Sequence, residues 1–178
     1  MISGGLFVGK RVGPISAYTH IADANARIAQ LTGVRFGEPY QQLLAKGGFV
    51  MSSEDAAAGL AALRALAPER GVHFAHRLQE AFYLNGRSLS GPDTIVDIAA
   101  SEGLDAAQVP SLLAGEFARK EALADFALAR QLGASTYPTL LFIDGTRVHG
   151  LPATGASIEA LNARLDVLMA NGAAHSFN

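Results

Sequence analysis

Apolar side chains follow two different spacings along the chain, and these separate a long helical block from short strands. From Pro14 to Gly33, and over 52–66, 69–84, 90–103 and 116–132, they recur every three or four residues, as on one face of a helix. Ser52 or Ser53, Ser90 and Asp105 stand where helix caps are expected. The intervening region 34–51, rich in glycine, is expected to be looser.

Strand patterns lie at the two ends of this block. Residues 1–8 are short and apolar, and the runs 137–143 and 146–150 flank Asp144-Gly145, a dipeptide typical of a hairpin turn. Ser157 is placed to cap a last helix that ends near Gly172. A single strand or an isolated hairpin is unstable, so we expect them to share one sheet.

The order of elements therefore predicts an α/β fold with an all-helical insertion. We assign residues 1–12 and 134–172 to the sheet-containing part, as a strand, then a hairpin and a final helix. Residues 13–133 form the insertion. The sequence shows no internal repeat and no low-complexity segment.

The stretch GGLFVGKR at residues 4–11 has part of the spacing of a phosphate-binding loop. Gly4, Gly9 and Lys10 fit, but Arg11 stands where a Ser or Thr hydroxyl would hold Mg²⁺. Only three residues precede Gly4, too few for the strand that launches such a loop. We therefore expect an accidental match and no nucleotide site.

Composition and charge narrow the function further. The chain has 178 residues, 49% of them apolar and 17% charged, which suits one globular domain or one domain with an insertion. The net charge of −2 and the lack of a basic stripe argue against nucleic acid as a partner. No apolar run is long enough to cross a membrane, and no signal-peptide pattern is visible, so a cytoplasmic location is expected.

The sequence contains no cysteine. This excludes disulfides, thiolate metal sites and a cysteine nucleophile within these 178 residues.

Two longer segments carry a family resemblance. LQEAFYLNGRSLSGPDTIVDIAASEGLD and ADFALARQLGASTYPTLLF resemble the DsbA family of thioredoxin-fold proteins, and most closely its predicted protein-disulfide isomerases. The resemblance extends from about Met1 to Leu168. It implies a DsbA-like thioredoxin fold, thiol–disulfide oxidoreductase or isomerase activity, and protein or small thiol substrates. Residues 1–9 then correspond to the second strand of that fold.

The same resemblance implies that the chain is N-terminally incomplete. The family's fold begins one strand and one helix earlier, and that portion carries the C-x-x-C whose thiol pKa the helix dipole lowers. Either Met1 is an internal methionine of a longer protein, or the chain is a redox-inert relative. We favour the first, because the missing strand would leave unpaired edges inside the sheet. If the chain folds alone, we expect a partner chain or a local rearrangement to cover the gap. The intact mass of the protein from its source cells decides between the two explanations.

The resemblance also supplies the substrate-binding candidates, which are Thr136, Tyr137 and Pro138. The family's counterpart of Pro138 has a cis peptide bond and pairs with the substrate backbone, so Tyr137-Pro138 is expected to be cis. The alternative is a trans proline at the start of an edge strand. No catalytic residue, metal ligand or cofactor is assigned.

Other candidates have simpler interpretations. His73 and His76 share a helix face but lack a third ligand, so we interpret them as surface residues. We interpret His149 as an ordinary strand residue. Ser3, the only hydroxyl in the first predicted strand, is not assigned as a nucleophile.

Structural roles are also expected for several aromatic and acidic side chains. Phe74, Phe82 and Tyr83 are expected in the core between insertion and sheet, with a hydrophobic peptide groove as the alternative. The acids Asp93, Asp97, Glu116 and Asp125 are expected to cap helices or face solvent. His20 and His175 belong to no motif.

Three functions remain open. The first is a DsbA-family redox enzyme seen without its active-site segment. The second is a non-catalytic module that binds peptides, and the third is a glutathione-linked transferase or isomerase of the same fold. A homodimer is expected if an open sheet edge pairs with its copy.

Overall fold

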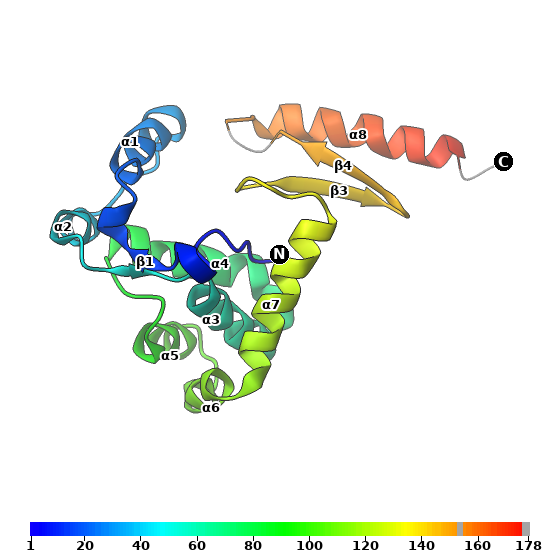
Figure 1. Cartoon of the computed structure of the whole chain (residues 1–178). Helices are drawn as coiled ribbons and strands as arrows, with labels where there is room; N and C mark the ends of the chain where they lie inside the picture. The colour runs from blue at the N-terminus through cyan, green and yellow to red at the C-terminus, as the bar shows by residue number, and fades with distance from the viewer. Residues whose placement is uncertain (153–154, 176–178) are drawn as a thin grey trace. The chain divides into compact units, whose positions relative to one another are not determined.

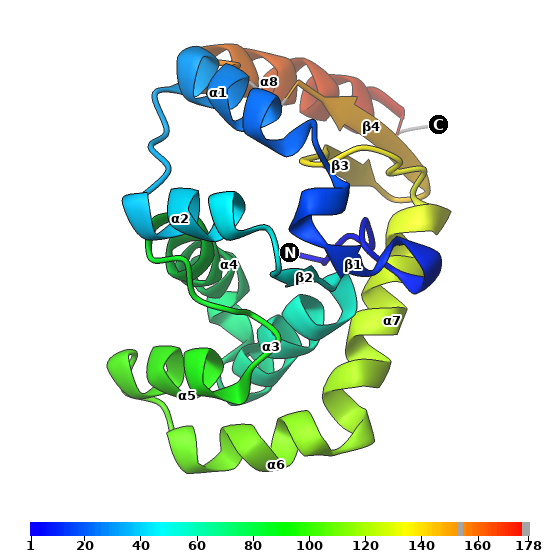
Figure 2. The same ribbon diagram turned by 60° about the vertical axis from the view of Figure 1, so that its left-hand side comes forward.

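The computed structural model describes residues 1–152 and 155–175, and the side chains of residues 1–152 and 155–170. The chain divides into two compact units, Met1–Ala129 and Arg130–Asn178, which we call unit 1 and unit 2. Each is described by itself. Figures 1 and 2 show the helix-rich unit 1 and the hairpin with its helix in unit 2.

Unit 1 consists mainly of helices joined by short turns. The α-helices are α1 (Ile21–Thr32), α2 (Glu38–Lys46), α3 (Ser53–Leu66), α4 (Gly71–Gln79), α5 (Pro92–Ser101), α6 (Val109–Ala114) and α7 (Glu116–Gln131). A π-helical turn, η4 (Glu80–Leu84), continues α4. The 3₁₀ turns are η1 (Gly9–Arg11), η2 (Ile15–Ala17), η3 (Pro68–Arg70) and η5 (Ala106–Gln108).

Two of the helix caps predicted for unit 1 are confirmed, whereas Ser90 was wrongly predicted as a cap, because Gly91 stands at the N-cap of α5 and no side chain caps that helix. The Ser52 hydroxyl accepts from the Asp55 N–H at 3.3 Å at the start of α3, as predicted. The Asp105 carboxylate accepts from the Ala107 N–H at 3.2 Å and starts η5. Gly33 ends α1 with φ 73°, a left-handed conformation that favours glycine.

The main core of unit 1 lies where α3, α4, α5 and α6 meet. Leu63, Phe74, Ile95 and Val109 are at most 1% exposed and belong to one contiguous cluster. Burying side chains of this size contributes about 1.5–3 kcal/mol each. A second cluster of alanines packs α3 against α7 and includes Ala62 and Ala118. Small side chains allow the two helices to approach closely.

Residues 1–8 form no strand, contrary to the expectation from their apolar pattern. Side chains of unit 1 satisfy their backbone instead. The Phe7 N–H donates to the Ser53 hydroxyl at 2.8 Å, and the Ser53 N–H donates to the Phe7 carbonyl at 2.9 Å. Gly5 lies against the Phe126 ring, where an added Cβ would be 3.1 Å away. These contacts join the segment to α3 and α7.

The region expected to be loose contains a helix and a short ladder. Gly37 and Pro39 precede and open α2, and Gly47 ends it with φ 70°. The strands β1 (Gly13–Pro14) and β2 (Val50–Met51) pair antiparallel, with Gly13 opposite Met51. Glycine and proline here mark the ends of a helix, not an irregular loop.

Unit 2 contains the predicted hairpin and last helix. Strands β3 (Leu140–Asp144) and β4 (Arg147–Leu151) pair antiparallel, with Leu140 opposite Leu151 and Asp144 opposite Arg147. Helix α8 (Ile158–His175) runs beside the hairpin in Figures 1 and 2 and continues three residues past its predicted end at Gly172. The Ser157 hydroxyl accepts from the Ala160 N–H at 3.2 Å and caps this helix, as predicted.

Few side chains are buried in the described part of unit 2. Leu151 and Leu168 are buried, whereas Leu140, Ile143 and Val148 remain at least 41% exposed. The assignment of residues 1–12 and 134–172 to one domain stays a prediction.

Candidate functional site

The segment before β3 holds the three predicted substrate-binding residues. Thr136, Tyr137 and Pro138 form an exposed bend between α7 and β3. The Tyr137-Pro138 peptide bond is cis, which confirms the prediction for this bond. The Thr139 hydroxyl donates to the Thr136 carbonyl and closes the bend.

The side chains of this bend are accessible to a ligand. Tyr137 is 45% exposed, and Leu140, the first residue of β3, is 41% exposed. The backbone of the bend leads directly into β3. The pairing of β3 with β4 fixes the direction of this strand. An exposed aromatic ring beside a strand can pack against an extended peptide. The role of these residues in binding stays a prediction.

His149 belongs to β4, as its sequence pattern indicated. It lies opposite Phe142 of β3, and their ring centroids are 6.2 Å apart. The ring is half-buried in unit 2. This contact packs the hairpin and gives His149 a structural role.

Charged side chains of η3 and α4 surround the carboxylate of Glu102, which follows α5. Arg70 pairs with Glu102 Oε2, His73 Nε2 lies 2.7 Å from the same oxygen, and Arg77 Nε lies 2.9 Å from Oε1. The hydrogen bond from His73, followed by the nearby charges, lowers the pKa of Glu102 despite partial burial. We call these four residues the Glu102 cluster. It ties α4 to the end of α5.

The two histidines predicted to lie at the surface, His73 and His76, contact different carboxylates. His76 lies 3.4 Å from Glu80, whereas His73 contacts Glu102, so the two rings have different partners. No group of three metal-ligating side chains occurs among the residues whose side chains are described. His20 precedes α1 and packs edge-on against Tyr18. The side chain of His175 lies outside the described part.

Asp125 was expected to face solvent, and this expectation was wrong. It is 8% exposed, and its Oδ2 lies 3.0 Å from Arg64 Nη1. It also accepts the Ser3 N–H at 2.8 Å. Ser3 therefore joins the structure through its backbone. The other three acids agree with their expected surface roles: Asp93 in the first turn of α5, Asp97 paired with Arg87, and Glu116 paired with Lys120.

The aromatic residues 74, 82 and 83 lie in unit 1, two in the core and one at its surface. Phe74 and Phe82 are buried, and Tyr83 is 37% exposed. Tyr83 packs 5.3 Å from Tyr40 and 5.6 Å from Phe36, measured between ring centroids. Burial, and then the neighbouring phenol of Tyr40, raises the pKa of Tyr83.

Sequence reasoning did not group Phe36, Tyr40 and Phe49 with these rings. Tyr40 is 1% exposed, and Phe49 lies 5.3 Å from Phe82. Burial raises the pKa of Tyr40, and a hydrogen bond from Asn25 partly opposes this shift. The signal was present as Phe36 and Tyr40, four residues apart, followed by Leu43 and Leu44 at helical spacing. It was missed because the glycines of this region suggested a loop.

The opening stretch does not form a phosphate-binding loop. Gly4 to Val8 is irregular, and Gly9–Arg11 forms a single 3₁₀ turn where an α-helix would be required. The Arg11 side chain donates to the Gly5 carbonyl at 3.4 Å. This geometry agrees with the expectation that the spacing of a phosphate-binding loop at residues 4–11 is accidental.

Two further observations concern the cysteine content and the hydrophobicity of the helices. The 178 residues contain no cysteine. Among the described residues, no helix is both long and apolar enough to span a bilayer.

Comparisons with known proteins give one consistent relationship. A family model described as thioredoxin matches residues 55–161, more than half of the chain. The cytosolic disulfide reductase DsbM from Pseudomonas aeruginosa is similar over 94% of this chain and 82% of its own, with 26% identity and a TM-score of 0.77. A second structure of that reductase, with GSH, has the same identity and coverage and a TM-score of 0.74.

A candidate protein disulfide isomerase from Nitrosomonas europaea has a similar fold. Its structure matches 94% of this chain and 79% of its own, with 22% identity and a TM-score of 0.77.

Proposed function

The chain belongs to the thioredoxin family as a DsbA-like member, and from this premise we propose that it takes part in thiol–disulfide exchange as the substrate-binding part of an oxidoreductase. The observation that carries the proposal is the similarity to a disulfide reductase over 94% of the chain at 26% identity. The substrates are proteins or small thiols, and glutathione is the small thiol that the GSH-containing structure suggests.

The proposed binding residues are Thr136, Tyr137 and Pro138. Their exposure and their position directly before β3 support this role. A substrate backbone would lie along the bend, with the Tyr137 ring beside it. Strand-like pairing of this kind derives its affinity from main-chain hydrogen bonds.

The attacking thiolate does not come from these 178 residues. Thiol–disulfide exchange requires a thiolate that attacks a sulfur of the disulfide, and the sequence has no cysteine. The chain by itself is therefore expected to bind substrate without turning it over.

Two measurements test this function. First, we expect no reduction of glutathione disulfide or insulin by the purified chain. Second, titration of isotope-labelled protein with glutathione should shift the amide resonances of Thr136, Tyr137 and Thr139 saturably. Tyr137→Ala should weaken this binding, and Ile158→Ala, at a site that is 72% exposed in the same unit, should not. Saturable shifts elsewhere, or none, would overturn the proposal.

A non-catalytic peptide-binding module is the second candidate, favoured by the absence of cysteine. It predicts that cysteine-free peptides bind the Tyr137-Pro138 bend as well as peptides that contain cysteine. A clear preference for thiols or disulfides supports the oxidoreductase. A glutathione-linked transferase or isomerase instead predicts conjugation or isomerisation with glutathione.

Location and assembly are also proposals. A cytoplasmic location is supported by the cytosolic reductase among the similar structures. A homodimer remains the proposal for an open sheet edge, and sedimentation as a monomer would remove it.

A further inference from the structure

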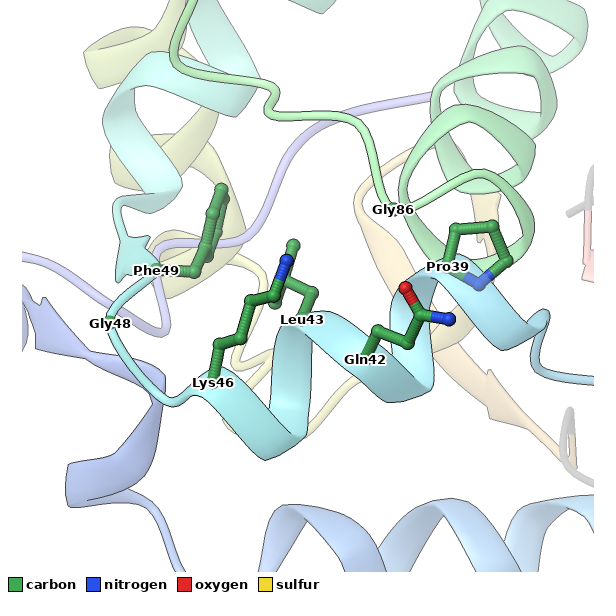
Figure 3. Close-up of a pocket in the computed structure, with 7 residues that line it drawn as sticks. All are labelled: Pro39, Gln42, Leu43, Lys46, Gly48, Phe49 and Gly86. Carbon is green, nitrogen blue, oxygen red and sulfur yellow. The ribbon is translucent and has the colours of Figure 1, made fainter.

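A cavity of about 440 Å³ opens on unit 1 between α2 and the chain around Gly86. Its lining comprises Pro39, Gln42, Leu43, Lys46, Gly48, Phe49 and Gly86 (Figure 3). This volume lies within the usual range for small-ligand pockets. The cavity belongs wholly to unit 1, whereas the Tyr137-Pro138 bend belongs to unit 2.

One helix face supplies most of the wall. Pro39, Gln42, Leu43 and Lys46 follow the i, i+3, i+4, i+7 pattern of α2, so their side chains lie on the same side. Phe49, just after this helix, contributes an aromatic ring that is half-buried against Phe82. The wall thus combines apolar side chains with two polar ones, Gln42 and Lys46.

Gly86 fixes the other wall at the start of α2. Its φ is 62°, and an added Cβ would lie 2.8 Å from the carbonyl of Pro39. Only a glycine allows the backbone to approach this closely. Backbone packing therefore holds the chain around Gly86 against the start of α2, at one end of this solvent-open pocket.

Lys46 gives the cavity its charge. Among the described residues its ammonium makes no ion pair. It lies in the last turn of α2, where the helix dipole contributes about half a negative charge. The full positive charge of the lysine exceeds this. The Glu38 carboxylate, which accepts from Gln42, lies two turns earlier at the start of α2, so an anion is favoured at the Lys46 end of the wall.

Gln42 lies one turn before Lys46 and adds a hydrogen-bonding group. Its Nε2 donates to Glu38 Oε1 at 3.2 Å, which holds the amide in place. The amide oxygen of Gln42 can then accept an N–H from a ligand. Along the wall the order is thus the acceptor of Gln42, the cation of Lys46 and the ring of Phe49 (Figure 3).

We propose that this cavity binds the C-terminal residue of a peptide that ends in an apolar or aromatic side chain. Lys46 holds the terminal carboxylate, Gln42 accepts the N–H of the last peptide bond, and the terminal side chain packs on Phe49 and Leu43. Charge complementarity selects a carboxylate, and the single acceptor at Gln42 selects a peptide over a simple fatty acid.

The test uses two probes that differ in one charge. N-acetyl-Gly-Phe as the free acid, and the same dipeptide as its carboxamide, are titrated into the isotope-labelled chain. The free acid should shift the Gly48, Phe49 and Gly86 amides saturably at concentrations up to about 10 mM. The carboxamide should bind about fivefold more weakly, because an exposed ion pair contributes at most about that factor.

Substitutions assign the effect to Lys46. Lys46→Met should abolish the difference between acid and carboxamide, whereas Lys10→Met, at an exposed lysine on η1, should preserve it. Both positions are exposed, so both variants should fold. Equal binding of the two probes by the original chain, or an acid preference that survives Lys46→Met, would overturn the proposal. Shifts at Thr136 to Thr139 report on the separate site of unit 2.

Discussion

Unit 1 and unit 2 bury their apolar side chains to very different extents. In unit 1, Leu63 and Phe74 are fully buried where helices meet. In the described part of unit 2, Ile143 and Val148 remain 52% and 43% exposed on a two-stranded hairpin. Helices joined by short turns can enclose a core among themselves. In the described part of unit 2, a hairpin and one helix form two layers, which enclose less apolar surface.

The comparison predicts that core truncation acts unequally in the two units. Phe74→Ala should lower the free energy of unfolding by about 3–5 kcal/mol, because it leaves a cavity in the main cluster. Ile143→Ala should lower it by less than about 1 kcal/mol, since half of that side chain already meets solvent. Denaturant unfolding of both variants measures the difference. Equal losses would contradict the contrast between the units.

A second variant tests how tightly unit 1 is packed away from its main core. An added Cβ at Gly37 would lie 1.9 Å from the Leu84 carbonyl oxygen, so Gly37→Ala should cost about 2–3 kcal/mol. Gly37 has φ −71°, so the cost is steric and not conformational. Gly13→Ala is the control, because its Cβ meets nothing within 4 Å. Similar unfolding midpoints for the two variants would show that the α2 contact yields easily.

A third variant compares buried with exposed charge within unit 1. Arg64→Met removes the partner of the buried Asp125 carboxylate and the bond to the Met1 carbonyl, at an expected cost of about 1.5 kcal/mol. Arg119→Met breaks an exposed pair with Glu54 and should cost less than about 0.5 kcal/mol. Thermal unfolding of both proteins gives the ranking. The reverse order would mean that Ser3 alone satisfies Asp125.

The smallest expected effect concerns the Glu102 cluster. The pKa of Glu102 is lowered in the folded chain, so its carboxylate stabilises the fold above its ordinary pKa of 4.5. This contribution disappears as the pH falls through the lowered value. Glu102→Gln should therefore lose less stability than the original chain between pH 6 and pH 3, in a series of denaturant midpoints. Parallel pH profiles would exclude a role for this carboxylate.

Local signals predicted the helix caps, the hairpin and the final helix, since each depends on neighbours in the chain. Ser52, Ser157 and Asp144-Gly145 act within a few residues of themselves. Asp125 was misjudged because its partners Arg64 and Ser3 are 61 and 122 residues away. Residues 1–8 were misjudged for the same reason, because the Phe7 N–H donates to the hydroxyl of Ser53, which is 46 residues away.

The candidate site was predictable only in part. Resemblance indicated Thr136, Tyr137 and Pro138, and the cis bond agrees with it. Periodicity alone did not reveal the cavity beside Phe49, because Gly37 and Gly47 resemble loop residues until the helix between them is seen. A cavity also depends on how two segments approach, as Gly86 and Pro39 do here, and pattern along one segment carries no such information.

The π-helical turn η4 depends on the number of residues between Glu80 and Asn85. The Asn85 N–H reaches back five residues to the Glu80 carbonyl, and the Tyr83 carbonyl accepts the Gly37 N–H at 2.9 Å. Deleting one residue here would restore an ordinary α-helix and rotate all that follows by about 100°. The Tyr83 carbonyl would then turn away from Gly37. We therefore expect insertions and deletions to be tolerated before or after this turn more readily than within it. Variants of this sequence should keep the number of residues between Glu80 and Asn85.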